Sequence, residues 1–334
     1  MVNIKITMSA CMETGKPKIA ILMAVYEPRM DWLREQLLSL DAQTYPNLTL
    51  YVRDDCSPTV PFEDIEKCIR ECIRAFPYTI ARNEKNLGSN GTFELLTSEA
   101  EAEYFAYCDQ DDIWLPEKLE ILQREIEKTG ALLVCSDMYV IDGEGKVRAD
   151  SITKVRKHHR FLSGDGLAEY LLFSNFVTGC TMLILSQIAK ESIPFCPFYV
   201  HDQYLALFSA EQGKVISVLC PLIYYRIHGE NQTLEMAGVF DRASYEKQRI
   251  DIVIYRLSWL NKYFSCSEKL NVQITEGLKW AIARKKNWHH KGGIFTIIKN
   301  RRFSPITSVF ELFGAWFPKR ILLYFVNLKR NNRV

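Results

Sequence analysis

Three carboxylates lie within four residues, at Asp109, Asp111 and Asp112, directly after an apolar run that predicts a buried strand. Their mutual repulsion is costly unless a cation offsets it, and oxygen ligands favour Mg²⁺ or Mn²⁺ over Zn²⁺. Mg²⁺ usually takes one or two protein carboxylates and completes its shell with water and phosphate oxygens. The cluster therefore predicts a divalent-cation site. The alternative is a solvated turn that caps a helix beginning near Pro116.

Further polar groups follow other predicted strands or begin helices. The pair Asp54-Asp55 ends a strand, where Asp is either a turn former or an acceptor for a nucleotide base or ribose. Asp202 begins a helix, either as an N-cap or as a general base. Arg226 and His228 lie in a strand-end loop and can supply positive charge or hydrogen-bond donors to a diphosphate.

The elements that would position these groups alternate in type along the chain. Apolar runs predict strands at 19–25, 48–52, 78–80, 104–108 and 131–135, with amphipathic helices between them. This alternation predicts an α/β unit with a mostly parallel sheet, whose ligands bind outside the carboxyl ends of the strands. After residue 235 the pattern changes to amphipathic helices, so we expect a boundary there.

Composition and charge limit the class of protein. The chain has 334 residues, of which 48% are hydrophobic and 25% charged, so a disordered or collagen-like chain is excluded. Net charge is +2, yet residues 284–334 hold 12 Lys or Arg against the single acid Glu311, and residues 1–283 therefore carry −9. This segregation predicts an anionic partner for the tail, and an acidic body argues against nucleic acid.

Cysteine usage and hydropathy bear on the compartment. Ten Cys without a C-x-x-C pair predict reduced thiols, and no signal peptide is recognised, so we expect a cytoplasmic protein. Between residues 303 and 328, apolar and aromatic patches are flanked by basic residues. They predict a helix that lies peripherally on the anionic inner face of the plasma membrane. The alternatives are helices that pack on the body or form a homodimer interface.

Seven short motifs occur in a distinctive order. They are Ile19–Val25 with Tyr26-Glu27-Pro28, Asp54-Asp55-Cys56-Ser57, Asn86-Leu87-Gly88, Asp109-Gln110-Asp111-Asp112-Ile113-Trp114, Thr178-Gly179-Cys180, His201-Asp202 and Tyr225-Arg226-Ile227-His228. In this order they resemble the family 2 glycosyltransferases, and most of all the bacterial rhamnosyltransferase-like branch. The resemblance covers roughly residues 17–235. It implies a GT-A fold, a nucleotide-sugar donor, Mg²⁺ or Mn²⁺, and inversion at the anomeric carbon.

The resemblance also implies roles for single residues. Asp202 matches the general base, Asp111 the metal ligand, and His228 a contact to the metal or diphosphate. Donor contacts fall on Ala24, Val25, Tyr26, Glu27, Asp54, Asp55, Asn86, Gly88, Asp109, Gln110 and Arg226. Acceptor contacts fall on Trp114, Thr178, Gly179 and His201. The chain departs from the pattern at Glu27, where an Asn commonly follows the Tyr. It also lacks the Q-x-x-R-W motif of processive synthases, which argues for transfer of a single sugar.

These observations predict three regions and one activity. The regions are an N-terminal tail (1–16), a GT-A domain (17–235) and a basic helical segment (236–334). The activity is transfer of one sugar from dTDP-rhamnose or a UDP-sugar to a glycan or lipid-linked acceptor in cell-surface polysaccharide biosynthesis. Rival hypotheses are an inactive sugar-nucleotide-binding protein, which intact Asp111 and Asp202 argue against, and a metal-dependent phosphoesterase.

Overall fold

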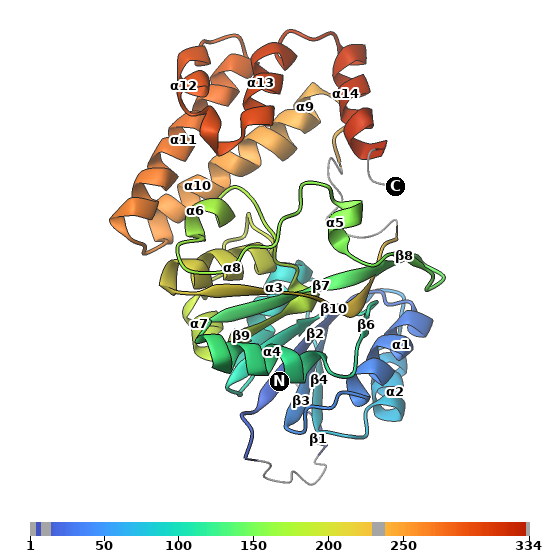
Figure 1. Cartoon of the computed structure of the whole chain (residues 1–334). Coiled ribbons are helices and arrows are strands. Elements are labelled where there is room, and N and C mark those ends of the chain that lie inside the picture. Colours follow the sequence, from blue (N-terminus) through green and yellow to red (C-terminus); the bar gives the residue numbers. More distant parts are fainter. Residues whose placement is uncertain (1–4, 8–14, 229–237, 332–334) are drawn as a thin grey trace. The chain divides into compact units, whose positions relative to one another are not determined.

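The computed structural model describes residues 5–7, 15–228 and 238–331 (Figure 1). The chain divides into two compact units. The first, here the N-terminal unit, comprises residues 1–171 and 175–228, and the second, here the helical unit, comprises 172–174 and 229–334. The boundary expected near residue 235 lies outside the described residues, as does most of the predicted N-terminal tail.

Ten strands within the described residues form the sheet of the N-terminal unit. They are β1 (Lys5–Thr7), β2 (Ile19–Val25), β3 (Leu48–Asp54), β4 (Tyr78–Arg82), β5 (Tyr104–Cys108), β6 (Ile113–Trp114), β7 (Leu133–Ile141), β8 (Val147–Ala149), β9 (Met182–Leu185) and β10 (Val215–Arg226). Their order is β1-β4-β3-β2-β5-β9-β7-β10-β6, with β8 beside β7. Strands β4, β3, β2 and β5 are mutually parallel, as are β7 and β10, while β9 runs antiparallel between β5 and β7.

The apolar runs of the sequence become the central strands. The five predicted strands are β2, β3, β4, β5 and β7, and β2 and β5 are almost completely buried, as expected for strands covered on both faces. Val25 pairs with Asp54, and Met23 pairs with Cys108. The carboxyl ends of β2, β3 and β5 therefore meet at one edge of the sheet, where the acidic motifs follow.

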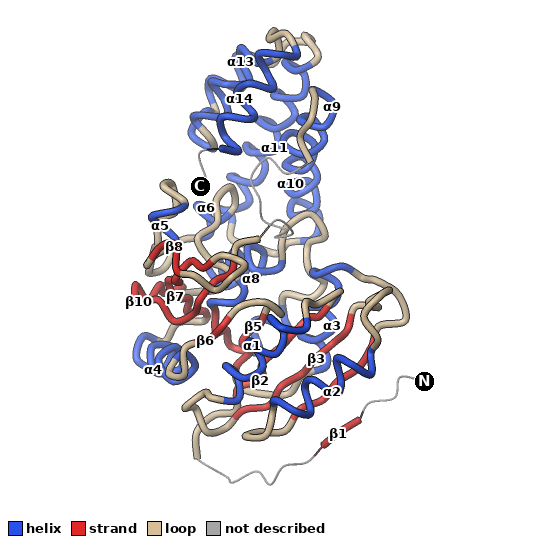
Figure 2. The backbone as a smooth tube through the Cα atoms, turned by 90° about the vertical axis from the view of Figure 1, so that its right-hand side faces the viewer, coloured by secondary structure: helices blue, strands red, loops and turns tan. Residues whose placement is uncertain are grey.

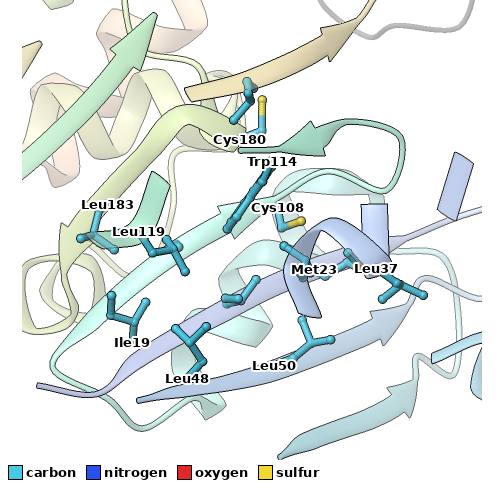
Figure 3. Close-up of a cluster of buried hydrophobic side chains, with 14 of the residues drawn as sticks. Ile19, Met23, Leu37, Leu48, Leu50, Cys108, Trp114, Leu119, Cys180 and Leu183 are labelled. Carbon is cyan, nitrogen blue, oxygen red and sulfur yellow. The ribbon is translucent and has the colours of Figure 1, made fainter. Parts of the chain in front are cut away.

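Helices of the N-terminal unit cover this sheet (Figure 2). They are α1 (Met30–Asp41), α2 (Phe62–Cys72), α3 (Gly88–Glu99), α4 (Lys118–Thr129), α5 (Ile152–Val155), α6 (Ala168–Leu171), α7 (Ser186–Glu191) and α8 (His201–Gln212). Helix α1 turns Leu33, Leu37 and Leu40 inward at helical spacing, and α4 does the same with Leu119 and Leu122. Figure 3 shows this core, in which Leu37 and Leu119 lie among side chains of β2, β3 and β5.

The helical unit contains α9 (Arg242–Tyr245), α10 (Ile252–Tyr263), α11 (Glu268–Trp288), α12 (Ile294–Lys299), α13 (Pro305–Gly314) and α14 (Lys319–Asn331). Its apolar cluster includes Tyr245, Ile250, Trp288 and Leu322. No helix in the described part of the chain has both the length and the apolar content needed to cross a bilayer.

A buried ion pair lies inside the helical unit. The Arg284 guanidinium donates to Glu311 Oε2 at 2.6 Å and to Oε1 at 2.7 Å, and both side chains are almost fully buried. Tyr245 Oη donates to Glu311 Oε1 at 2.9 Å, and Asn287 Nδ2 donates to the Glu311 carbonyl. Because burial of an unpaired charge is costly, Glu311 ties α13 to α11 through a fully hydrogen-bonded group.

Candidate active site

The acidic motif occupies the loop between β5 and β6. Asp109 and Asp111 are partly exposed, whereas Asp112 is buried. Asp111 Oδ2 lies 2.7 Å from Nε2 of His228, which follows the end of β10. The structure thus brings together the two residues that the sequence predicts as metal ligands, 117 positions apart in the chain.

Arg226 is buried and forms hydrogen bonds with the same acidic loop. Its backbone N–H donates to Asp112 Oδ1 at 2.9 Å, and its Nε donates to the Asp111 carbonyl at 2.8 Å. Nη1 donates to the Asp142 carbonyl, and Nη2 forms a 2.5 Å ion pair with Glu35 of α1. The side chain is 1% exposed. Protein acceptors bind the guanidinium, which therefore clamps the site loops, and the predicted contact of Arg226 with the donor stays a prediction.

A buried lysine faces the carboxylates. Lys118, the first residue of α4, donates from Nζ to the Cys180 carbonyl at 2.6 Å, and its ammonium lies 2.9 Å from the centroid of the Trp114 ring. Burial lowers the pKa of Lys118 to about 7, while the charges of neighbouring acidic groups, including Asp112 and Asp109, act to raise it. The residue is an internal positive charge that sequence reasoning missed.

The carboxyl groups of the loop lie close enough to repel each other. Burial, together with the charges of Asp111 and Asp202, raises the pKa of Asp109 to about 7. Burial likewise raises the pKa of Asp112 well above its usual range. Ligand atoms of Asp109, Asp112 and Cys180 lie within 4.8 Å of one another. Lys118 supplies positive charge beside that buried group, and the roles of the partly exposed Asp111 and His228 as cation ligands stay a prediction.

Replacing Lys118 by Met is expected to lower the free energy of unfolding by about 2 kcal/mol, because the buried Cys180 carbonyl loses a charged hydrogen-bond donor. Denaturant titration measures the change. Lys128→Met, at an exposed position of the same helix, is the matched control and should change stability by less than about 0.5 kcal/mol. Equal stabilities of the two variants would contradict the role assigned to Lys118.

Asp202 lies in the first turn of α8 and is 6% exposed. Its Oδ2 accepts from the Gly179 N–H at 3.0 Å, and its Oδ1 accepts from Asn175 Nδ2 at 3.2 Å. Burial raises the pKa of Asp202 to about 6, against the lowering effect of these hydrogen bonds. Gly179, which donates to Asp202, precedes Cys180, and the Cys180 sulfur lies within 4.8 Å of carboxylate oxygens of Asp109 and Asp112. A carboxylate with this pKa is suited to take a proton near neutral pH.

Three residues predicted to contact an acceptor lie in the packed interior. Trp114 is 2% exposed and belongs to the core. His201 is buried with its ring centroid 4.2 Å from that of Phe93, and burial lowers the pKa of His201 to about 3, so the ring is neutral. A Cβ at Gly179 would lie 2.6 Å from His201 Nε2. Trp114, His201 and Gly179 are therefore buried in this structure, whereas Thr178 is partly exposed. The acceptor contacts of all four residues stay a prediction.

The loops after β2, β3 and β5 are joined by hydrogen bonds. Tyr26 N–H donates to Gln110 Oε1 at 2.8 Å, and Gln110 Nε2 donates back to the Tyr26 carbonyl at 3.0 Å. Glu27 has φ +46°, a strained region for a non-glycine residue, and its N–H donates to Ser57 Oγ at 2.9 Å. Its carboxylate accepts from the Thr59 N–H. Tyr26 itself is exposed, so its ring is accessible at this edge.

The Asp54-Asp55 pair builds the neighbouring loop. Asp54 accepts from Ser57 Oγ at 2.5 Å and forms an ion pair with Arg82. Asp55 accepts from the N–H groups of Leu87 and Gly88 at 2.7 and 2.8 Å. Helix α3 begins at Gly88, where Asp55 caps the first turn. Both carboxylates are buried in these roles, and their contact with a nucleotide stays a prediction.

The remaining predicted donor residues differ in accessibility. Ala24 is partly exposed, whereas Val25 is buried and its carbonyl accepts from the Asp55 N–H. Asn86 is exposed, and its Oδ1 accepts from the Gly88 N–H at 3.0 Å. Gly88 has φ +72°, a conformation that favours glycine. Accessible donor candidates thus lie at the carboxyl ends of β2, β4 and β5.

Comparison with known proteins identifies the class. The model of the family "Glycosyl transferase family 2" matches residues 20–191. An uncharacterized glycosyltransferase of Nostoc sp. is 25% identical over 228 residues, 66% of this chain and 68% of the relative. The Escherichia coli UDP-Glc:alpha-D-GlcNAc-diphosphoundecaprenol beta-1,3-glucosyltransferase WfgD is 22% identical over 206 residues, 61% of this chain and 74% of the relative.

Solved structures share the fold. S. aureus TarS 1-349 in complex with UDP-GlcNAc has a TM-score of 0.56 at 15% identity, covering 95% of this chain and 89% of that chain. The mannosyltransferase PcManGT from Pyrobaculum calidifontis, in complex with GDP-Man and Mn²⁺, has a TM-score of 0.55 at 11% identity, covering 96% and 86%. The fold and the acidic site therefore define a glycosyltransferase with the GT-A architecture of nucleotide-sugar transferases.

The chain belongs to glycosyl transferase family 2. The predicted family and fold class are confirmed, whereas the rhamnosyltransferase-like branch stays a prediction.

Proposed function

We propose that this chain is an inverting, metal-dependent transferase that moves one sugar from a nucleotide-sugar donor to a hydroxyl group of an acceptor. The observation that carries the proposal is that two groups with different chemistry lie near the same acidic loop. One is the Asp111–His228 pair, with atoms 2.7 Å apart. The other is Asp202, which accepts from the Gly179 N–H, next to Cys180 whose sulfur lies within 4.8 Å of carboxylate oxygens of Asp109 and Asp112. A cation site beside a separate base is what sugar transfer with inversion requires.

Asp111 and His228 would hold the cation, with Asp109 adjacent. The partly exposed carboxylate of Asp111 suits Mn²⁺ or Mg²⁺, and the imidazole of His228 would add a nitrogen ligand. Burial and the charges of Asp111 and Asp202 raise the pKa of Asp109, so a positive charge is favourable here. When bound, the ion supplies charge stabilisation to the departing nucleoside diphosphate. The presence of Mn²⁺ in the PcManGT complex supports this choice.

Asp202 would accept the proton of the attacking hydroxyl group. The Gly179 N–H and Asn175 Nδ2 hold its carboxylate, while burial keeps its pKa at about 6. An alcohol is a poor nucleophile at neutral pH and needs a base within hydrogen-bond reach. Attack from the face opposite the diphosphate inverts the configuration at the anomeric carbon.

For the donor we retain dTDP-rhamnose and UDP-sugars. The exposed ring of Tyr26 and the partly exposed Gln110 and Ala24 provide the accessible surface for a nucleoside at the ends of β2 and β5. Among the similar proteins, TarS is complexed with UDP-GlcNAc and PcManGT with GDP-Man, and WfgD is named for UDP-Glc. Because WfgD is also named for a diphosphoundecaprenol-linked acceptor, we propose a lipid-linked or glycan acceptor in cell-surface polysaccharide biosynthesis.

A panel of nucleotide sugars with Mn²⁺ tests the proposal. We expect one donor to raise the thermal midpoint of unfolding, since saturation at 100 times Kd adds about 2.7 kcal/mol of stability. The same donor should release its nucleoside diphosphate only when an acceptor or water takes the sugar. A donor that binds without turnover would favour the inactive binding protein, and turnover of phosphate esters without a sugar acceptor would favour the phosphoesterase.

A further inference from the structure

Helix α13 presents its apolar side outward. The residues it buries are Ser308, Glu311 and Gly314, whereas Ile306, Val309 and Phe313 are 72%, 55% and 61% exposed. A helix of a globular protein normally shows the opposite distribution, with its apolar stripe toward the core. Exposed apolar clusters of this kind mark an interaction site.

The inward side of α13 is held by polar contacts. Ser308 Oγ accepts from Trp280 Nε1 at 3.1 Å, and Glu311 forms the buried ion pair with Arg284. Both partners lie on α11, so the orientation of α13 is set by hydrogen bonds that a rotated helix would lose. The outward apolar face is therefore part of the folded structure of the helical unit.

Neighbouring helices add to this surface. Phe295 of α12 is 80% exposed and Trp316, just after α13, is 67% exposed. Helix α12 contacts α13, and both contact α11. Helix α14 lies beside α13, with the ring centroids of Phe310 and Phe325 6.0 Å apart. We define the C-terminal apolar surface as the ten large exposed residues of α12, α13, α14 and the link after α13: Ile294, Phe295, Ile298, Ile306, Val309, Phe313, Trp316, Ile321, Tyr324 and Phe325.

Positive charge is interleaved with the C-terminal apolar surface. Six basic residues between its members or beside them are exposed: Lys291, Lys299, Arg301, Arg302, Lys319 and Arg320. Glu311 is the single acidic residue between positions 291 and 331, and it is buried and paired. The described surface of this segment therefore carries no exposed carboxylate side chain to offset the basic residues.

We infer that the C-terminal apolar surface docks on an anionic lipid bilayer, with its aromatic and aliphatic side chains in the interface and its basic side chains against lipid phosphates. Amphipathic aromatic rings and flanking Lys or Arg are the features that favour this environment. A second copy of the chain is a poorer occupant, because two surfaces with the same positive charge repel each other. The inference deepens the proposed function by naming the surface that reaches the acceptor. It rests on the proposed function only for the lipid-linked nature of that acceptor.

Deletion of the C-terminal residues would not test membrane docking. A truncation after residue 300 also removes Glu311 and leaves the Arg284 guanidinium buried without its carboxylate. Loss of one partner of a buried ion pair is strongly destabilising, so such a variant would lose vesicle binding through unfolding of the helical unit. Substitution of exposed residues avoids this problem.

The experiment is flotation of the full chain with vesicles of phosphatidylcholine, with or without phosphatidylglycerol, at low and high salt. We expect binding to the anionic vesicles alone and release by salt, because salt screens the attraction. The triple variant Phe295→Ser, Phe313→Ser, Trp316→Ser should bind at least ~10-fold more weakly. Its matched control is Leu38→Ser, Val147→Ser, Leu219→Ser, at exposed apolar positions of the N-terminal unit, which should bind like the wild type.

A charge variant separates the two contributions. Lys299→Gln, Arg301→Gln, Arg302→Gln should weaken binding about 100-fold, since each basic residue near an anionic surface contributes ~1 kcal/mol. Lys67→Gln, Arg70→Gln, Lys128→Gln removes three exposed charges elsewhere and is the control. The inference is overturned if the wild type does not bind anionic vesicles at low salt. It is also overturned if the wild type forms a dimer that the Ser variant abolishes and does not bind vesicles. Vesicle binding without sugar transfer to any acceptor would reject only the proposed function.

Discussion

Asp202→Asn is expected to lower kcat by ~10² or more while the affinity for the nucleotide sugar barely changes. The amide oxygen can still accept the hydrogen bond from the Gly179 N–H, so the fold of the α8 N-terminus should survive. The amide cannot take up a proton as the carboxylate does. Steady-state kinetics with saturating donor measure the effect on kcat, and thermal shift measures donor affinity. Asp165→Asn, at an exposed position of the same unit, is the control and should match the wild type.

The pH profile provides a second readout for Asp202. A general base works in its ionised form, and burial raises the pKa of Asp202 to about 6. The rate of the wild type should therefore fall as pH decreases through about 6 and level off above it. The Asp202→Asn variant should lack this limb. If the variant loses donor binding but keeps its turnover at saturation, Asp202 acts on the donor and not as the base.

Asp111→Asn is expected to reduce Mg²⁺- or Mn²⁺-dependent transfer by ~10³ or more, because the cation loses its charged ligand and the leaving diphosphate loses its stabilisation. The fold should persist, since Arg226 holds the loop through the Asp111 carbonyl and not through the side chain. Metal titration of the transfer rate and of donor-induced stabilisation measures both effects.

The control for this variant is Asp64→Asn, at an exposed position in the first turn of α2. It removes one carboxylate from the same unit at a distance from the β5–β6 loop in the sequence and should leave metal dependence unchanged. Full activity of Asp111→Asn, or of the wild type in excess EDTA, would show that the reaction proceeds without the proposed cation.

Much of the fold can be predicted from the sequence because local patterns dictate it. Strands β2 and β5 are continuous apolar runs, and only burial on both faces accounts for them. Their carboxyl ends then meet by the geometry of parallel pairing, which brings Asp111 to the functional edge. His228 joins it from far along the chain, and only the order of the motifs in the family indicated this proximity.

The sequence could not predict which side chains of the site point into the protein and which point toward solvent. Arg226 and His228 are two positions apart in the same motif, yet the first is clamped inside the protein and the second is partly exposed. Lys118 occurs among charged residues of an ordinary amphipathic helix, where a lysine normally faces solvent. Tertiary packing decided both cases, and no local pattern reveals it.

Because of the Arg226 clamp, the two proposed metal ligands lose their conformational entropy during folding and not when an ion binds. Its side chain holds the Asp111 backbone, the Asp142–Gly143 turn and Glu35, and it stands two residues before His228. The two proposed ligands are thereby preorganised on a common anchor, so folding has already restricted them before an ion arrives. Ion binding then loses little conformational freedom, and a modest number of protein ligands suffices for a cation that also coordinates the donor diphosphate.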